Sequence, residues 1–324
     1  MSNTLLSASN IVKRYANHTA LDGVSINVQQ GRIFGLLGPN GAGKTSLIRI
    51  INQITGPDDG YVELDGERLK PDHIKDIGYL PEERGLYKKM KVGEQAMYLA
   101  QLKGMHKRDA YLALREWFER FDIAEWWGKK VDELSKGMQQ KVQFIVTAVH
   151  KPKLLILDEP FSGFDPINTN LVKSEILRLR DEGATVIFST HNMASVEEVC
   201  DDIALINRSK VILDGSVKDV KEAYRGGLYD LEFKGEMIGF TNALWTNFEL
   251  LEREEVEKGH YVARVKLLGE HSANNLLQAV VPVVQVERLS PVIPSMNDIF
   301  IQKVTEMGEV VDPDPDHKAP ETAP

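Results

Sequence analysis

Cysteine is nearly absent from this chain, since Cys200 is the one cysteine among 324 residues. No intrachain disulfide can form, which fits the reducing conditions of a cytosol. We interpret Cys200 as a small core residue near a helix end. The chain also lacks any apolar stretch of the about 18–20 residues that a bilayer-crossing helix needs. Its first residues show neither the charged leader nor the apolar core of a signal peptide. A role at a membrane therefore requires a partner chain.

Basic residues are also in short supply. Lysine and arginine total 39 against 48 aspartates and glutamates, which gives a formal net charge of −9. Nucleic-acid binding needs clustered cations that neutralise phosphates, so this balance predicts no nucleic-acid partner. Hydrophobic residues make up 42% of the chain, which is ordinary for a globular protein. The length predicts one large domain and a smaller one.

A glycine-rich loop follows a predicted strand at 33–37 and precedes a predicted helix at 46–51. It matches the pattern G-x-x-x-x-G-K-[ST]. Small residues let backbone N–H groups turn inward around a phosphate, and the helix start offers its positive end to the same anion. Lys44 is expected to reach the β- and γ-phosphates and Thr45 to hold Mg²⁺. A glycine turn with an incidental lysine is the alternative, which the flanking strand and helix disfavour. The predicted nucleotide-binding residues here are Gly38, Pro39, Asn40, Gly41, Ala42, Gly43, Lys44, Thr45 and Ser46.

Two acidic residues follow a second apolar run at 154–157. Asp158, at the end of a predicted buried strand, is suited to orient Mg²⁺ or its water. Glu159 is then placed to polarise the attacking water as general base. Four aliphatic residues before two acids often mark only a strand leaving the core. Downstream of a phosphate loop, the chemical interpretation is favoured.

Two further side chains each allow a structural and a functional interpretation. His191 follows the predicted strand at 184–188. A lone histidine is usually structural, but the carboxyl edge of a parallel sheet is where ligands bind, so this residue could contact the γ-phosphate. Tyr15 follows the first predicted strand and is either a half-buried aromatic or a ring stacked on adenine. The residues alone leave that choice open.

In their order, these segments resemble the ATP-binding subunits of ABC transporters over residues 4–225. The resemblance implies ATP and Mg²⁺ as cofactors, an ATPase with Glu159, His191 and Lys44 as catalytic residues, and Tyr15 against adenine. It also implies that Glu82 contacts nucleotide or Mg²⁺, alongside the metal-binding Thr45 and Asp158. The matching segments are Tyr15, GPNGAGKT at 38–45, GYLPE at 78–82, LSKGMQQ at 134–140, LLILDE at 154–159, SGFD at 162–165 and His191.

The resemblance further implies that two copies, or this chain and a second ABC subunit, face each other head to tail. Each ATP would lie between the 38–45 loop of one copy and Ser135 and Gly137 of the other. Asp165 would lie near the interface between the two copies. Three departures from the family pattern stand out. Glu82 replaces a common glutamine and, when ionised, accepts hydrogen bonds but donates none. Lys136 and Met138 stand in a segment that usually reads Ser-Gly-Gly-Gln, and we expect Lys136 to face solvent.

The implied partner is a separate multi-span permease, which would hold the protein in the cytoplasm at the inner face of the membrane. Export is favoured by family analogy alone. The alternative is a soluble ABC ATPase acting on a macromolecule such as a ribosome or DNA, against which stand the single ABC module and the negative charge.

The predicted fold class is α/β. It comprises an ABC ATPase domain at 1–226, with a mixed-sheet core and a helical subdomain at about 85–150, and a small α+β domain at 227–308. The order βαββαβ there suggests a ferredoxin-like unit with an added helix, for which self-association is favoured over small-molecule sensing. Residues 77–87 and 294–300 resemble the subset that includes sodium-export-type ATPases. The proline-rich acidic tail at 309–324 is expected to be disordered.

Overall fold

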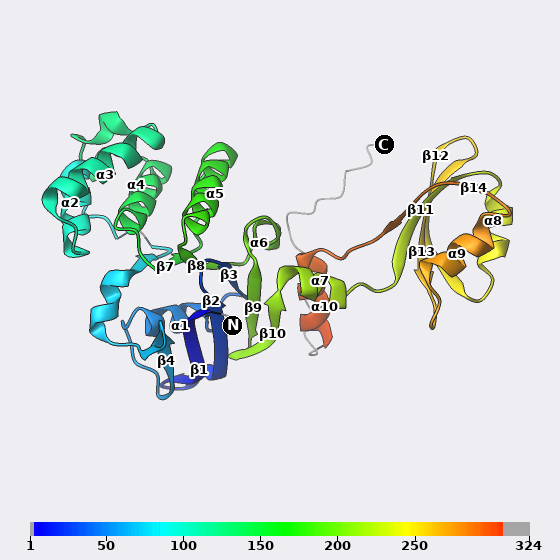
Figure 1. The fold of residues 1–324 in the computed structure, drawn as a ribbon, viewed down its shortest axis with the longest axis horizontal. Helices are drawn as coiled ribbons and strands as arrows, with labels where there is room; N and C mark the ends of the chain where they lie inside the picture. The colour runs from blue at the N-terminus through cyan, green and yellow to red at the C-terminus, as the bar shows by residue number, and fades with distance from the viewer. Residues whose placement is uncertain (1–2, 84, 307–324) are drawn as a thin grey trace. The chain divides into compact units, whose positions relative to one another are not determined.

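The computed structural model of the protein describes residues 3–83 and 85–306. Their packing divides the chain into two compact units, Met1–Val217 and Lys218–Pro324 (Figure 1). The predicted boundary at 226 falls between α7 (Val217–Ala223) and β11 (Leu228–Lys234), and the domain limits stay a prediction. The tail at 309–324 lies outside the described residues. In the part of the chain that the structure describes, no helix has the length and apolar character to cross a membrane.

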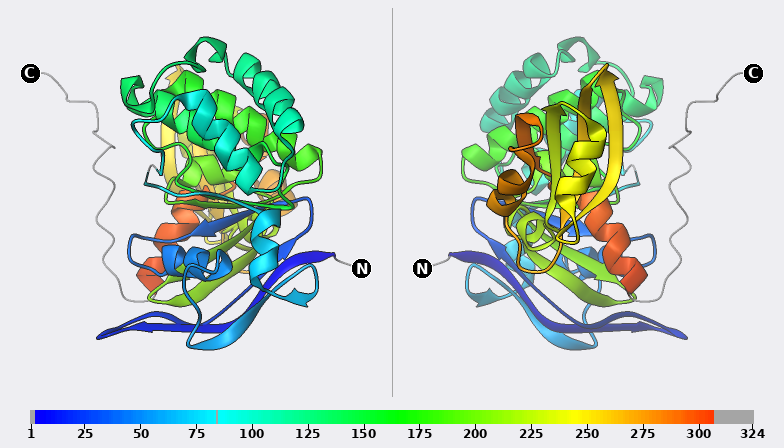
Figure 2. Two further views of the ribbon diagram at one scale, coloured as in Figure 1. Left: turned by 90° about the vertical axis from the view of Figure 1, so that its left-hand side faces the viewer. Right: turned by 90° about the vertical axis from the view of Figure 1, so that its right-hand side faces the viewer.

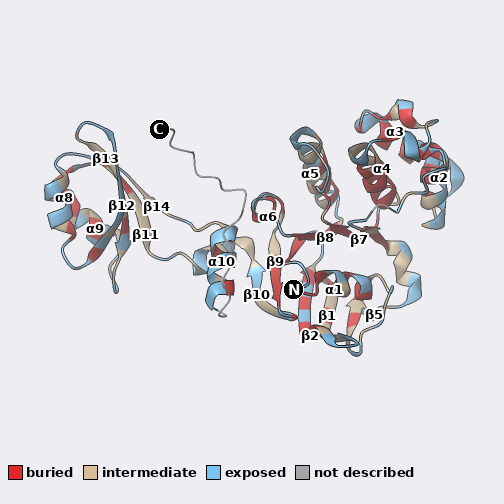
Figure 3. Ribbon diagram, turned by 180° about the vertical axis from the view of Figure 1, so that it is seen from behind, coloured by how far each residue is buried: buried red, intermediate tan, exposed pale blue. Residues whose placement is uncertain are grey.

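A six-stranded mixed sheet forms the centre of the first unit, in the order β10-β9-β3-β8-β7-β6. Neighbouring strands from β9 to β6 are parallel, and β10 runs antiparallel to β9. The central strands are buried along their length because other elements cover both faces of the sheet (Figure 3). The strands are β3 (Ile33–Leu37), β6 (Ile77–Leu80), β7 (Leu154–Asp158), β8 (Thr185–Thr190), β9 (Asp202–Asn207) and β10 (Lys210–Ser216).

A second, antiparallel sheet of order β2-β1-β4-β5 covers one face of the first. Helix α1 (Lys44–Ile51) lies between the two sheets, since its apolar residues are buried in the core to which both contribute. This position fixes the helix that begins at the phosphate loop. The remaining elements here are β1 (Thr4–Tyr15), β2 (His18–Gln29), β4 (Asp59–Leu64), β5 (Glu67–Arg68) and the 3-10 helix η1 (Pro71–Asp76).

The predicted helical subdomain gathers beyond β7 in the first unit (Figures 1 and 2). Its core is aromatic: the rings of Trp117 and Phe121 lie 6.1 and 5.8 Å from that of Phe144. Helical periodicity places Tyr111 on the same face as Trp117 and Phe121 and so predicts a buried ring, but Tyr111 is 46% exposed and meets the Trp127 ring in a T-shaped contact. The elements are α2 (Val92–Leu102), α3 (Lys107–Arg120), η2 (Ala124–Trp126), η3 (Val131–Glu133) and α4 (Lys136–Ala148).

Two helices connect the central strands of the mixed sheet. Helix α5 (Pro166–Asp181) joins β7 to β8, and α6 (Met193–Val199) joins β8 to β9. Pro166 opens α5, where a proline suits the first helical turn because no intrahelical partner is lost. Cys200 follows α6 and packs against the core, and burial raises the pKa of its thiol, as expected for a structural cysteine.

The second unit contains a four-stranded antiparallel sheet in the order β12-β13-β11-β14. Strands β11 and β13 are central, and α8 and α9 each connect a central strand to an edge strand, which is the ferredoxin-like arrangement predicted from the βαββαβ order. Phe233 of β11 stacks on Phe240 of α8 with ring centroids 4.2 Å apart. The elements are α8 (Met237–Leu244), β12 (Phe248–Glu257), β13 (His260–Leu267), α9 (Ala273–Val280), β14 (Gln285–Pro291) and α10 (Met296–Glu306).

Candidate functional site

The glycine-rich loop joins the carboxyl end of β3 to the start of α1. Gly43 has φ 116°, and a Cβ atom on it would lie 2.3 Å from the carbonyl oxygen of Ala20. Gly38 has φ 142°, and its Cβ would lie 2.0 Å from the carbonyl oxygen of Ile206. Both positions therefore require glycine for conformation and for space. The loop therefore packs closely against β2 and β9, and its backbone turns tightly where α1 begins.

Lys44 lies inside this loop and is only 7% exposed. Its Nζ donates to the carbonyl oxygens of Gly38 and Pro39, at 2.6 and 3.0 Å. Burial lowers the pKa of Lys44, whereas the nearby carboxylates of Glu159, Asp158 and Glu82 act in the opposite direction. The ammonium group is therefore held by two neutral carbonyls among three acids, a suitable place for an anion that supplies stronger acceptors.

Asp158 ends β7 and is 4% exposed. Burial raises the pKa of its carboxyl and the negative charges of Glu159 and Glu82 raise it further, whereas Ser189 and the Lys44 ammonium act in the opposite direction. Burying a carboxylate beside other negative charges is costly, and a cation brought to the site would offset that cost.

Glu159 is held by the strand end beside it. Its Oε2 accepts from the Thr190 hydroxyl at 3.2 Å, and its Oε1 accepts from the His191 backbone N–H at 3.0 Å. The His191 ring Nδ1 lies 2.7 Å from the same Oε1. Glu159 adopts φ 48°, a left-handed conformation that costs a non-glycine residue of order 1–3 kcal/mol. Its own N–H donates to the Ser189 carbonyl at 2.9 Å, which fixes that conformation against β8.

A cavity of about 300 Å³ brings these groups together. Its lining includes Tyr15, whose side chain is 41% exposed, and the exposed Glu82 in the segment after β6. Gly38 and Pro39 support the site through Lys44 without lining the cavity. From the predicted residues, the structure gathers Tyr15, Asn40, Gly41, Ala42, Gly43, Lys44, Thr45, Ser46, Glu82, Asp158, Glu159 and His191.

Two residues of this cavity were missed in the sequence. His18 and Ala20 line it from the start of β2. His18 pairs directly with Tyr15 in the β1–β2 register, so the hairpin carries both side chains to the loop. The turn after Tyr15 was visible in the sequence, but nothing there indicated that the hairpin packs on the glycine-rich loop.

Besides Gly38 and Pro39, three predicted residues lie outside this cavity. Ser135 caps α4 by accepting from the Met138 N–H at 3.3 Å, and Asp165 caps α5 by accepting from the Asn168 N–H at 2.9 Å. The backbone hydrogen bond from Asn168 lowers the pKa of Asp165. Gly137 lies in the first turn of α4. Their predicted place in the site of a second copy stays a prediction.

The two departures beside Ser135 have distinct surroundings. Lys136 is exposed, whereas Met138 is partly buried and packs against the core of the helical subdomain. The adjacent Gln139 donates through Nε2 to the carbonyl oxygens of Val131 and Leu134, at 3.3 and 2.9 Å. The Gln139 side chain thus links the turn before Ser135 to the first turn of α4 by hydrogen bonds.

The chain matches three described protein families, of which one, an AAA domain described as a putative AbiEii toxin of a type IV toxin–antitoxin system, covers residues 130–197. The family described as ABC transporter matches residues 21–162, and the C-terminal domain of DrrA1-3-like ATP-binding proteins matches residues 215–304. An uncharacterised ABC transporter ATP-binding protein, YhaQ of Bacillus subtilis (strain 168), is 37% identical over 300 residues, covering 93% of this chain and 98% of YhaQ. The chain belongs to the ABC transporter ATP-binding proteins.

This ABC protein also resembles the ABC transporter ATP-binding protein NatA of Bacillus subtilis (strain 168), at 31% identity over 68% of the chain and 91% of NatA. A solved structure of an ATP-binding subunit of an ABC transporter superposes with a TM-score of 0.64, at 28% identity over 68% of this chain and 93% of that one. The resemblance drawn from the sequence and the predicted fold class are therefore confirmed. The protein is the ATP-binding subunit of an ABC transporter and an ABC-type ATPase.

Proposed function

We propose that this ABC protein pairs with a second copy of itself or with another ABC subunit, hydrolyses Mg²⁺-ATP at the shared sites, and thereby powers export through a separate permease. The observation that carries this proposal is the position of the Glu159 carboxylate. It faces the glycine-rich loop and Lys44 in one cavity, fixed by Thr190 and His191.

The cavity fits a nucleotide triphosphate. The loop ends at the N-terminus of α1, and its backbone N–H groups together with Lys44 supply donors for phosphate oxygens. Exchange of the Gly38 and Pro39 carbonyls for phosphate gives the Lys44 ammonium a charged partner. The exposed Tyr15 ring offers a surface for adenine, with the Lys13 ammonium 5.5 Å from its centroid.

Mg²⁺ fits the acidic side of the cavity. Asp158 is a buried carboxylate beside two further acids, which is a donor set that a hard dication stabilises. Thr45, Asp158 and Glu82 would hold the ion or its waters, and the bound ion would neutralise phosphate charge. Within the described ranges, no three His, Cys, Asp or Glu side chains gather as a metal-binding group. Phosphate oxygens and water would complete the coordination, as is usual for Mg²⁺.

Glu159 would accept a proton from the attacking water, and His191 would orient the Glu159 carboxylate. The His191 ring and backbone N–H both lie within hydrogen-bonding distance of Oε1, which leaves Oε2 with the Thr190 hydroxyl as its partner. The His191 side chain is 68% exposed, so its ring is accessible from outside the chain. It is therefore well placed to contact the γ-phosphate.

The second copy would contribute Ser135 and Gly137. Both stand at the start of α4, outside the cavity of their own chain, so they are available to another chain. Lys136 is exposed between them, in keeping with the expectation that it faces solvent. Asp165 would lie near the interface between the two chains. Its side chain caps α5 and thereby fixes the end of the loop that follows Glu159.

The permease would dock at a groove of about 560 Å³ in the first unit. The groove lies between the helical subdomain and the segment that carries Glu82, so a partner seated there would touch both. Its Leu102 is 63% exposed, a large apolar side chain that a membrane partner would cover. Other lining residues include Ile74, Leu86, Leu99, Val146 and His150. This docking would hold the protein in the cytoplasm at the inner face of the membrane.

Glu159→Gln tests the catalytic assignment. The amide retains the shape and an acceptor for Thr190, so ATP binding should persist, whereas loss of a general base should slow hydrolysis about 10²–10⁴-fold. The variant should also accumulate as an ATP-bound dimer in size-exclusion chromatography. Glu254→Gln, at an exposed position on β12, is the matched control and should hydrolyse ATP normally. Rapid turnover in the Glu159 variant would contradict the assignment.

Leu102→Glu tests the docking surface. The charge should release the protein from membranes that contain its permease while ATP binding stays unchanged, as measured by fractionation and nucleotide titration. Leu112→Glu is the control, because Leu112 is 57% exposed on α3 and does not line the groove. Equal release of both variants would argue against the groove.

A further inference from the structure

The strand register brings Thr190 beside Glu159 at the carboxyl edge of the mixed sheet. In the parallel pair β7 and β8, Asp158 lies opposite Ser189, so the chain leaves both strands at the same point. Thr190 ends β8 and is only 2% exposed. A β-branched side chain has restricted χ1 rotation, so burial in a strand holds the Thr190 hydroxyl in one position next to the Glu159 carboxylate.

The two hydrogen-bond partners of Thr190 set the direction in which its hydroxyl donates. Its Oγ1 accepts from the Asn192 N–H at 3.1 Å and lies 3.2 Å from Glu159 Oε2. Asn192 caps α6 by accepting from the Ser195 N–H at 3.0 Å, so this N–H is itself fixed in place. Because an N–H cannot accept and an ionised carboxylate cannot donate, the Thr190 proton points to Glu159.

The Glu159 carboxylate is therefore held at both of its oxygens. Oε1 accepts from the His191 N–H and lies 2.7 Å from His191 Nδ1, whereas Thr190 is the partner of Oε2 among the described residues. The terminal torsion of a glutamate is soft, so a carboxylate held through one oxygen can rotate about that contact. The contact with Thr190 fixes the plane of the carboxylate.

We propose that Thr190 is a positioning residue for ATP hydrolysis, whose hydroxyl orients the Glu159 carboxylate toward the attacking water. The inference rests on the proposed function, in which Glu159 is the general base. Thr190 does not line the nucleotide cavity, so it acts through Glu159 and not through contact with ATP. The 3.2 Å separation should shorten when substrate is bound, as catalytic hydrogen bonds commonly do.

Thr190→Val tests the proposal in the full-length protein. Valine keeps the branched shape that suits a buried strand and removes the hydroxyl. Steady-state ATP hydrolysis should show a kcat about 10–100-fold lower, the factor expected for losing a hydrogen bond to a charged group. KM for ATP and the affinity measured by nucleotide titration should stay unchanged. Thr190→Ser restores the hydroxyl and should retain at least about a third of the original kcat, since serine loses only the χ1 restriction.

Thr185→Val is the matched control on the same strand. Thr185 is fully buried, and its Oγ1 also accepts from a backbone N–H, that of Gly31 at 2.9 Å. Its replacement by valine leaves the same kind of unpaired N–H without touching Glu159. Thermal unfolding should therefore show similar losses of stability in Thr185→Val and Thr190→Val, whereas kcat should fall only in the latter.

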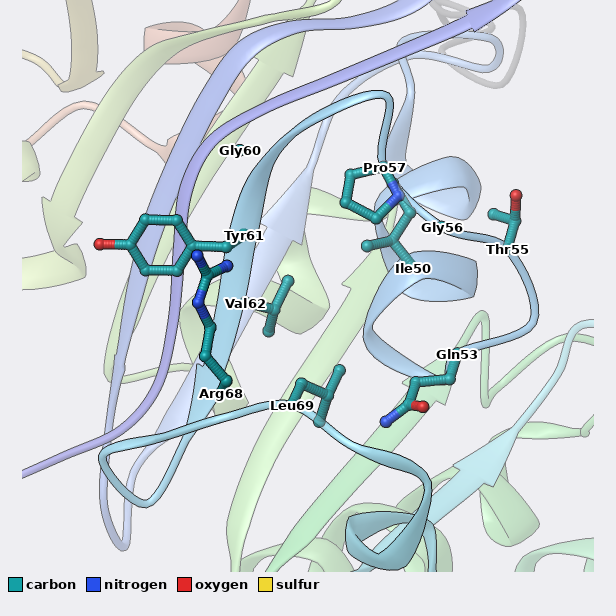
Figure 4. A pocket seen from close by; sticks show the side chains of 10 residues that line it. All are labelled: Ile50, Gln53, Thr55, Gly56, Pro57, Gly60, Tyr61, Val62, Arg68 and Leu69. Carbon is teal, nitrogen blue, oxygen red and sulfur yellow. The ribbon is translucent and has the colours of Figure 1, made fainter.

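A second control removes a hydroxyl from the segment after α1. Thr55 lines a separate cavity at the other end of this helix, which shares no lining residue with the nucleotide cavity (Figure 4). Thr55→Val should leave both kcat and KM unchanged, because the helix that begins at the phosphate loop keeps its contacts there.

A double-mutant cycle separates action through Glu159 from general damage to the site. In a Glu159→Gln background the proposed base is already lost, so adding Thr190→Val should lower the residual hydrolysis rate less than about twofold. A substitution that only loosened the site would lower the rate by the same factor in both backgrounds.

An unchanged kcat in Thr190→Val would overturn the proposal, as would an equal loss of kcat in Thr185→Val. A serine variant as slow as the valine variant, or the same fold-loss in the Glu159→Gln background, would also overturn it. Each of these results can occur while Glu159→Gln alone is slow, and would then leave the proposed function standing. Rapid turnover by Glu159→Gln alone would instead refute the general base, and the role of Thr190 with it.

Discussion

Replacement of Gly43 by alanine should damage the phosphate loop by two separable effects. The left-handed conformation at φ 116° costs alanine about 1–2 kcal/mol. The new Cβ would also lie 2.3 Å from the Ala20 carbonyl oxygen and 2.9 Å from Leu21 Cδ2, an overlap that forces a backbone shift costing about 1–3 kcal/mol. The two effects together lower stability by roughly 2–5 kcal/mol.

Gly41→Ala isolates the conformational part. Gly41 has φ 80°, but its Cβ would meet nothing within 4 Å, so only the strain of about 1–2 kcal/mol applies. Because the first unit holds Trp117, Trp126 and Trp127, thermal unfolding followed by tryptophan fluorescence reports mainly on it. Gly43→Ala should melt roughly 2–12 °C below Gly41→Ala. It should also bind ATP more weakly, because the Gly43 carbonyl accepts the Leu47 N–H at the start of α1. Equal melting temperatures would refute the steric reasoning.

Three further outcomes are expected. Lys44→Ala should abolish tight ATP binding in a nucleotide titration, and unchanged affinity would remove the phosphate-loop assignment. Gly137→Ala should not lower thermal stability, since its Cβ would lie 3.4 Å from the Gly163 carbonyl oxygen and alanine is favoured in helices. In a Glu159→Gln background it should still reduce ATP-dependent dimerisation, and an undiminished dimer would contradict the predicted role of this segment. Burial lowers the pKa of His150 to about 4. Because the buried ring is neutral in the folded state, its contribution to the free energy of unfolding should be complete above pH 6.5 and fall by about 3 kcal/mol as the pH drops to 4. His150→Gln should reduce the fall in the free energy of unfolding between pH 6.5 and pH 4, as measured by urea unfolding. An unchanged pH dependence in this variant would contradict the prediction.

Much of the fold was predictable because its signals are local. The alternation of apolar runs with the 38–45 loop predicted the mixed sheet, and the βαββαβ order predicted the second unit. Tyr111 was placed wrongly because helical periodicity identifies a face but not where the packing ends. There the Trp127 ring, from a later turn, meets the Tyr111 ring in a T-shaped contact, and Tyr111 stays 46% exposed.

The sequence by itself predicted the residues that we propose for the nucleotide site. The phosphate loop, Asp158, Glu159 and His191 belong to short segments whose spacing along the chain is enough to predict them. Only the tertiary structure decided which distant groups join them. It brings His18 and Ala20 to the loop through the β1–β2 hairpin, and it fixes the Glu159 carboxylate between Thr190 and His191. Such arrangements depend on packing between segments far apart in the chain, for which no local pattern exists.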